Sequence, residues 1–247
     1  MNAFLNWTPP ILARLMGRVR RDYICGGYMG LEGLDRRLVE AIAPGRNGYF
    51  VELGAFDGVA QSNTYVLQRR FGWTGLLVEP SPVRFEECVR NRGFGNAPHV
   101  RCAACVPQGF ADAYVPLLEA GLMSVAQGLA VSDDEANLHA RLGASLIPGK
   151  PTPYAYAAIA KTLTSILDEV AAPRVIDLLS LDVEGNERAV LEGVDFEKYT
   201  FRWMLVESRD DCLISNVLLQ HGYEPVAELS TSEERRDVLY AASPKHA

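Results

Sequence analysis

The feature that most constrains the fold of this chain is the alternation of short apolar segments with helix-like segments. Five apolar segments have the length of single strands: 49–53, 75–79, 99–106, 178–182 and 203–207. Four segments that follow such strands have the pattern of helices: 62–71, 81–92, 186–192 and 213–220. Strands that are apolar on both faces and alternate with helices are typical of a parallel sheet covered on both sides. We therefore predict an α/β fold with a mostly parallel sheet.

The end of the chain follows a different pattern. Residues 224–229 and 237–242 have the pattern of strands, and the polar segment 230–235 joins them. No helix fits between these two strands. We therefore predict an antiparallel C-terminal hairpin at one edge of the sheet.

The remaining segments define the domain organisation. We predict an N-terminal helical segment at 1–47, followed by the α/β domain at 48–247. Two helices that cap the sheet are one interpretation of the N-terminal segment, and a flap over a substrate or partner is the other. An insertion at about 108–173 is much longer than the usual connection of about 2–6 residues, and such insertions often form lids over substrates. Two helices are expected within it, at 133–142 and 163–170.

Composition excludes several functions. The net charge of −7 and the pI of about 5.2 leave no basic footprint for nucleic acid. No apolar run reaches the roughly 18 residues of a membrane span, and the N-terminus lacks the pattern of a signal peptide. Five cysteines, an odd number, favour a reducing cytoplasm. Cys102 and Cys105 are expected to be buried thiols, because residues three apart on a strand point to opposite faces.

Ligands of open α/β sheets bind at the carboxyl ends of the strands, so the first strand end is informative. Glu52, Gly54 and Asp57 surround the turn after the first strand. The dinucleotide motif GxGxxG would need glycines where Phe56 and Val59 stand, and no P-loop motif follows. Carboxylates at this turn repel a pyrophosphate and tolerate a cationic ligand.

The second strand ends in Glu79, and Pro80-Ser81 follow it. A carboxylate at this position accepts hydrogen bonds from the two hydroxyls of a ribose. An acid, a glycine turn and a second acid in this order suit S-adenosylmethionine, which carries an ammonium, a sulfonium and a ribose but no phosphate. The sequence therefore favours a methyltransferase.

Four sequence blocks resemble the FkbM-type methyltransferases, over roughly residues 48–240. They are Tyr49-Phe-Val-Glu-Leu-Gly-Ala-Phe-Asp-Gly58, Ser62-Asn-Thr-Tyr65, Gly72-Trp-Thr-Gly-Leu-Leu-Val-Glu-Pro80 and Ile176-Asp-Leu-Leu-Ser-Leu-Asp-Val-Glu-Gly185. The resemblance implies a Rossmann-like class I methyltransferase fold, S-adenosylmethionine as cofactor, and methylation of a hydroxyl on a sugar, glycan or natural product. The candidate cofactor-binding residues are then Glu52, Gly54, Ala55, Asp57, Asn63, Glu79, Pro80, Ser81 and Asp182.

Methyl transfer to a hydroxyl is helped by a base, because the acceptor's pKa is high. Asp182 ends the fourth strand beside the first turn, and Glu184 and Glu207 lie at the same edge of the sheet. Three acids suggest a base with a shifted pKa, and a divalent metal site is the less favoured alternative. Glu184 could instead pair with Arg188 one helical turn on. His139 is the remaining catalytic candidate, although a solvated helix position is its more common role.

Two further candidates within the insertion are Tyr154 and Tyr156, which could stack on a sugar ring or pack within a lid. The alternatives to a methyltransferase are a non-catalytic nucleoside-binding module of Rossmann-like fold and an NAD-dependent oxidoreductase. The acceptor's identity and the presence of a homo-oligomer stay open.

Overall fold

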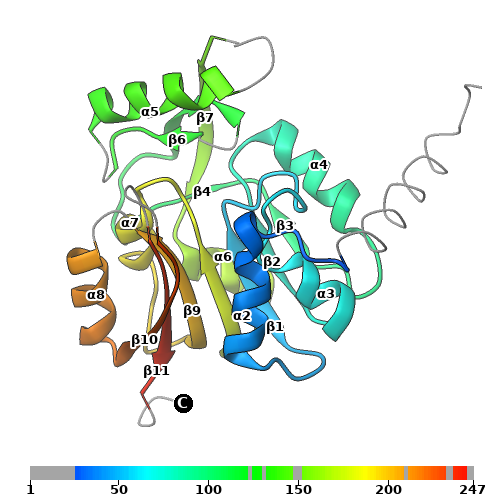
Figure 1. The fold of residues 1–247 in the computed structure, drawn as a ribbon. Helices are drawn as coiled ribbons and strands as arrows, with labels where there is room; N and C mark the ends of the chain where they lie inside the picture. The colour runs from blue at the N-terminus through cyan, green and yellow to red at the C-terminus, as the bar shows by residue number, and fades with distance from the viewer. Residues whose placement is uncertain are drawn as a thin grey trace, which may run out of the picture.

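The computed structural model describes residues 26–121, 124–129, 132–146, 152–208, 211–231 and 236–243. A seven-stranded main sheet forms the centre of the molecule (Figure 1). In chain order its strands are β1 (Tyr49–Leu53), β2 (Thr74–Val78), β3 (His99–Arg101), β8 (Val175–Leu181), β9 (Thr200–Ser208), β10 (Tyr223–Thr231) and β11 (Arg236–Ala242). Each of the five apolar segments identified in the sequence contributes a strand to this sheet.

The strand order is β10-β11-β9-β8-β1-β2-β3. The five strands from β9 to β3 are parallel, β11 is antiparallel to β9, and β10 is antiparallel to β11. The predicted parallel sheet and its C-terminal antiparallel hairpin are therefore confirmed. The hairpin is folded back so that its second strand, β11, lies between β9 and the edge strand β10.

Helices cover both faces of the main sheet because its side chains alternate between two apolar clusters. One cluster joins sheet residues such as Val51 and Leu179 to α6 (Leu163–Glu169), α7 (Glu187–Leu191) and α8 (Asp211–Gln220). The other joins residues such as Phe50 and Leu178 to α2 (Leu34–Ile42), α3 (Tyr65–Phe71) and α4 (Pro82–Arg92). The 3-10 turn η1 (Leu31–Gly33) leads directly into α2.

A second, four-stranded sheet was not predicted. Its strands β4 (Ala104–Cys105), β5 (Tyr114–Glu119), β6 (Val125–Ala126) and β7 (Tyr154–Lys161) follow the order β4-β7-β5-β6. The predicted single strand at 99–106 is wrong: β3 pairs with β2, whereas β4 pairs with β7. The chain changes sheets between them, and a break between sheets leaves no mark in an apolar run.

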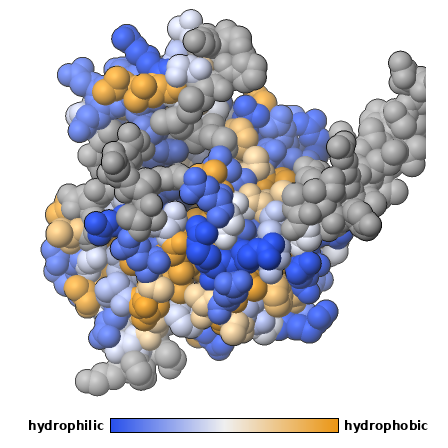
Figure 2. Space-filling model, in the orientation of Figure 1, coloured by the Kyte–Doolittle hydropathy of each residue, from blue (hydrophilic) through white to orange (hydrophobic). Residues whose placement is uncertain are grey.

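The small sheet lies above the carboxyl edge of the main sheet, together with α5 (Asp133–Leu146) (Figure 1). Ala136 and Ala140 of α5 pack against Leu118 and Val125 of the small sheet. The exposed side of α5 is mixed: Figure 2 shows an apolar strip over this helix beside hydrophilic residues, and Leu138 and Leu142 are 61% and 53% exposed. Helix α6, which lies within the segment expected to be the insertion, packs into the main core.

The N-terminal prediction is tested only in part. The first expected helix, around Leu12 to Val19, lies outside the described residues. The second is α2, and its Leu34 and Leu38 are buried against the main sheet, as the capping interpretation expects. Within the described part of the chain, no helix is both long and apolar enough to cross a membrane.

Candidate functional site

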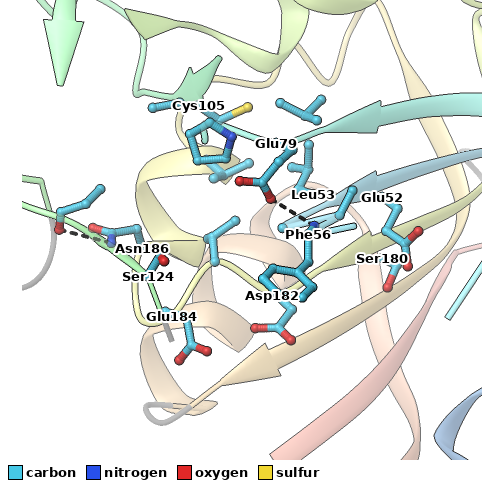
Figure 3. A pocket seen from close by; sticks show the side chains of 18 of the residues that line it. Glu52, Leu53, Phe56, Glu79, Cys105, Ser124, Ser180, Asp182, Glu184 and Asn186 are labelled. Carbon is cyan, nitrogen blue, oxygen red and sulfur yellow. Dashed lines mark hydrogen bonds between the residues drawn. The ribbon is translucent and has the colours of Figure 1, made fainter. Parts of the chain in front are cut away.

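A pocket opens at the carboxyl edge of the main sheet, where β1 and β8 lie side by side. The chain leaves β1 toward β2 on one side and β8 toward β9 on the other, so this is the topological switch point of the sheet. The pocket has a volume of about 290 Å³, and Leu117 and Ala126 of the small sheet contribute to its wall. Figure 3 shows the carboxylates of Glu79 and Asp182 at the pocket, well apart from each other.

The turn after β1 needs a glycine at its first position. Gly54 has a φ of +77°, and a Cβ atom there would lie 1.9 Å from the backbone oxygen of Asp182. The close approach of β1 and β8 therefore depends on the missing side chain. Phe56 and Gln61 also have positive φ values, 49° and 60°, and both line the pocket. Backbone strain of this kind is found mostly at functional sites.

Glu79 closes the turn from the end of β2. Its carboxylate accepts hydrogen bonds from the backbone N–H groups of Phe56 and Ser81, each at 2.8 Å. Burial raises the pKa of Glu79 to about 7, the two backbone donors oppose this, and the charge of Glu119 adds to it. The side chain is in place to bind a ligand's hydroxyl groups, and it also fixes the shape of the turn.

Glu52 lines the pocket, but its carboxylate is held by neighbouring protein groups. It accepts hydrogen bonds from the hydroxyls of Ser62 and Thr64 and from the backbone N–H of Asn63. The guanidinium of Arg92 lies 3.6 Å from it, and Arg92 is completely buried. This network also explains why α3 begins at Tyr65, later than predicted: residues 62–64 make polar contacts with Glu52 instead of a helical turn.

Arg92 is a residue that the sequence did not point to. Its guanidinium donates to the side chain of Gln68 and to the backbone oxygen of Gly58. It therefore ties the end of α4 to the turn beneath the pocket. An arginine in the last turn of a helix normally suggests a solvated cation, so no local signal distinguishes this one.

Asn63 reaches the pocket from the loop before α3. Its side-chain N–H donates to the hydroxyl of Ser180 at 3.1 Å, whereas its side-chain oxygen is buried and has no hydrogen-bond partner. Asn63 is only 8% exposed. An acceptor left without a donor costs free energy, so this atom is suited to a ligand that donates a hydrogen bond.

The other predicted cofactor residues divide into two groups. Ala55 and Pro80 line the pocket, whereas Asp57 and Ser81 are not among the residues that line it. One oxygen of Asp57 accepts the backbone N–H groups of Val59 and Ala60, which shapes the turn. Ser81 occupies the position before α4, which begins at Pro82.

Asp182 lines the pocket at the end of β8. Burial raises its pKa well above the ordinary value, and the negative charges of Glu207, Glu184, Glu187 and Asp237 raise it further, in that order. The structure thus brings together the three acids that the sequence placed at one edge. Within the described residues, no group of three or more His, Cys, Asp or Glu side chains is arranged to hold a metal ion.

Glu184 pairs with His139 of α5, at 2.8 Å between Nε2 and the carboxylate. The prediction that Glu184 pairs with Arg188 is wrong, because Arg188 pairs with Glu192 at 2.7 Å. The solvated position expected for His139 is also wrong: its exposed fraction is 7%, because α5 packs against the small sheet and its side chain lies against Glu184.

Glu187, the first residue of α7, holds the loop that precedes this helix. Its carboxylate accepts the backbone N–H groups of Val183 and Gly185. Of the two tyrosines considered for sugar stacking, Tyr154 is 56% exposed, and its ring centroid lies 6.3 Å from that of Tyr156. Neither tyrosine is among the residues that line the pocket.

The wall of the pocket is acidic. Its charged members are the carboxylates of Glu52, Glu79, Asp182 and Glu184, and no lysine, arginine or histidine is among the described residues that line it. The remainder of the wall is largely apolar, with Pro80 among its members. Such a pocket favours a cationic, partly apolar ligand over a phosphate-bearing one.

The mostly parallel sheet with its β10–β11 hairpin, together with a pocket at the switch point, defines a Rossmann-like class I methyltransferase fold. The sequence narrows this class further. Residues 52–224 match the model of the FkbM methyltransferase domain, and the chain belongs to this family. The resemblance seen in the sequence is therefore confirmed. No curated protein matches the chain.

Solved structures with a similar fold share little sequence with this chain. The METTL16 MTase domain aligns with a TM-score of 0.50 and 12% identity, over 96% of this chain and 82% of that one. Magnesium protoporphyrin IX methyltransferase (ChlM) from Synechocystis PCC 6803 with bound SAM gives 0.44 and 10%, over 97% and 86%. MtNAS in complex with MTA and tNA gives 0.44 and 11%, over 93% of this chain and only 65% of that one.

Proposed function

We propose that the protein is an S-adenosylmethionine-dependent O-methyltransferase that acts on a hydroxyl of a sugar, glycan or natural product. The observation that carries the proposal is the acidic pocket at the switch point, which combines the Gly54 turn with Glu79 and has no lining cation among the described residues. The methyltransferase family of the chain supports the same reaction class.

The pocket residues fit this cofactor. Glu79, at the end of β2, would hold the ribose hydroxyls, and the apolar wall at Pro80, Ala103 and Leu117 would take the adenine. Ala55 and the backbone at Gly54 would lie along the middle of the molecule, where no side chain blocks approach. Asn63 would accept a hydrogen bond through its unpartnered oxygen.

Asp182 is the base in this proposal. When bound, S-adenosylmethionine supplies an electrophilic methyl group, and the acceptor hydroxyl must lose its proton as the new carbon–oxygen bond forms. The pKa of Asp182 is raised, so its carboxylate binds a proton more strongly than an ordinary aspartate does. Glu184 lies at the same edge of the main sheet as Asp182. His139 reaches Glu184 from α5, which packs on the small sheet.

The acidic wall of the pocket also restricts the charge of the acceptor molecule. No lysine, arginine or histidine is among the described residues that line the pocket, so a phosphate group would find no cationic partner there, and nucleic acids and phosphorylated sugars are disfavoured acceptors. A neutral or cationic hydroxylated molecule is the class that fits.

Calorimetric titration tests the cofactor. We expect S-adenosylmethionine and S-adenosylhomocysteine to bind and NAD not to bind. Absence of binding by both sulfur nucleosides would refute the proposal, and binding of NAD alone would favour an oxidoreductase.

The Asp182→Asn variant tests the base. We expect it to lose methyl transfer to a hydroxylated acceptor pool while S-adenosylhomocysteine affinity stays within a few-fold. The matched control is Asp112→Asn, which removes the charge of an exposed aspartate and should leave turnover unchanged. Normal turnover by Asp182→Asn would overturn the assignment of the base but not the reaction class.

A further inference from the structure

The pocket has a second end, away from Glu52. Figure 3 shows Ser124, Glu184 and Asn186 on one side of Asp182, whereas Glu52 lies on the other side. We call the end formed by Ser124, Glu184 and Asn186 the cap end. In the proposed arrangement the cofactor fills the remainder of the pocket, so the cap end is left for the acceptor.

The cap end lies where the small sheet meets the loop after β8. The side-chain N–H of Asn186 donates to the backbone oxygen of Ala126 in β6, at 3.5 Å. The hydroxyl of Ser124 is used within its own turn: it accepts the backbone N–H of Ala120 at 2.9 Å and donates to the backbone oxygen three residues earlier at 2.7 Å. These two side chains therefore join segments of the protein, and Glu184 carries the charge of the cap end.

Glu184 is suited to the binding of hydroxyl groups. Its side chain is 16% exposed and lines the pocket. A carboxylate offers about four acceptor positions and no donor, so it can contact the protein and a ligand at the same time. Glu184 also has a φ of 58°, a left-handed backbone that disfavours residues with a Cβ and that is found mostly at functional sites.

His139 lies behind Glu184 and not in the pocket. Its Nε2 is 2.8 Å from the carboxylate of Glu184, but His139 is not among the described residues that line the pocket. Ala136 and Ala140, on either side of it in α5, pack against the small sheet and fix where the imidazole lies. A side chain that does not reach the cavity does not touch a ligand, so any effect of His139 on the reaction acts through Glu184.

We propose that the cap end binds the acceptor, that Glu184 accepts a hydrogen bond from a hydroxyl next to the one that is methylated, and that His139 is a positioning residue for Glu184. Asp182, the proposed base, and Glu184 line the same pocket two residues apart in the chain, so one acceptor can present a hydroxyl to each. The favoured acceptor class is a polyol with adjacent hydroxyls. This inference rests on the proposed function, because it concerns the second reactant of the same pocket.

The experiment uses probes that reach the cap end without the natural acceptor. They are analogues of S-adenosylmethionine in which a nitrogen replaces the sulfur and carries a pendant chain in place of the methyl group. One chain is propyl and the other is 2,3-dihydroxypropyl, which has the same length and two adjacent hydroxyls. Calorimetry should show that the wild type binds the dihydroxypropyl analogue about tenfold more tightly than the propyl analogue.

Three variants test the two residues. Glu184→Gln should reduce the preference for the dihydroxypropyl chain to within about twofold, and so should His139→Leu, which keeps a side chain of similar size without a polar atom. His139→Gln keeps an N–H donor and should retain most of the preference, a rescue that a merely structural role would not give. The matched control is His99→Leu, at an exposed histidine of β3, which should keep the full preference. Binding of S-adenosylhomocysteine within about twofold of wild type reports that each variant is folded.

The outcomes separate this inference from the proposed function. Should neither S-adenosylhomocysteine nor the propyl analogue bind the wild type, the proposed function fails. Should both bind while the dihydroxypropyl chain gives no gain, the acceptor subsite alone is refuted. A preference that survives Glu184→Gln overturns the role of Glu184, and equal behaviour of His139→Leu and His139→Gln overturns that of His139. Should Glu184→Gln weaken S-adenosylhomocysteine as much as the dihydroxypropyl analogue, Glu184 acts on the cofactor and the inference is also refuted.

Discussion

Replacing Gly54 with alanine tests whether the close approach of β1 and β8 creates the pocket. The added Cβ would lie 1.9 Å from the backbone oxygen of Asp182, a contact that no side-chain movement relieves. The left-handed backbone at this position costs a residue with a Cβ about 1–2 kcal/mol. Forcing an extra carbon into a packed site costs typically about 1–3 kcal/mol more. We therefore expect Gly54→Ala to lower the free energy of unfolding by about 2–5 kcal/mol.

Thermal and urea unfolding measure this effect. For a chain of this length the loss corresponds to a melting temperature lower by about 4–20 °C. Calorimetry should show that S-adenosylhomocysteine binding is weakened as well, because the strand ends must separate. The matched control is Gly45→Ala, where an added Cβ meets no atom within 4 Å. A Gly54→Ala protein as stable as the control, with unchanged ligand affinity, would refute the reasoning.

Three further predictions concern charged groups. Arg92→Met should lower the free energy of unfolding by about 3–5 kcal/mol in urea titrations, because it leaves the buried carboxylate of Glu52 unpaired; a loss below about 1 kcal/mol would contradict this. The pKa of Glu79 is raised from 4.5 to about 7, so its contribution to stability is greatest below pH 4.5 and is lost as the pH rises through 7. In the ligand-free protein, Glu79→Gln should therefore abolish the decrease in melting temperature over this pH range. If the variant and the wild type show the same dependence of melting temperature on pH, this prediction is wrong. Arg188→Ala breaks only the exposed pair with Glu192 and should change stability by less than about 0.5 kcal/mol, with a larger change arguing against this assignment.

Local chemistry made much of the site predictable. The turn after β1 needs Gly54, and the strand ends carry Glu79 and Asp182, so three adjacent positions of the sheet could be placed from sequence alone. What the sequence left open was how each carboxylate is used. Glu79 is bound by two backbone N–H groups, and Glu52 is bound by its own loop and by Arg92. A residue's type does not reveal whether its hydrogen bonds go to a ligand or to the protein.

Pairs of residues distant in the chain were the features that escaped prediction. His139 meets Glu184 only because α5, which packs on the small sheet, lies beside the loop after β8. The small sheet was missed because β4 continues the apolar pattern of β3 and yet pairs with β7. Periodicity reports which face of a strand is apolar, and it carries no information on which strand lies beside it.

The sequence by itself determined the α/β class, the parallel strands, the C-terminal hairpin and the family, because apolar periodicity and turn residues act over a few positions. Only the tertiary structure decided that the chain changes sheets after β3, that a buried arginine lies beneath the pocket, and that Glu207 and Asp237 face each other across β9 and β11. These depend on strand register and on packing between distant segments, where the free energy belongs to pairs of residues and not to either residue alone.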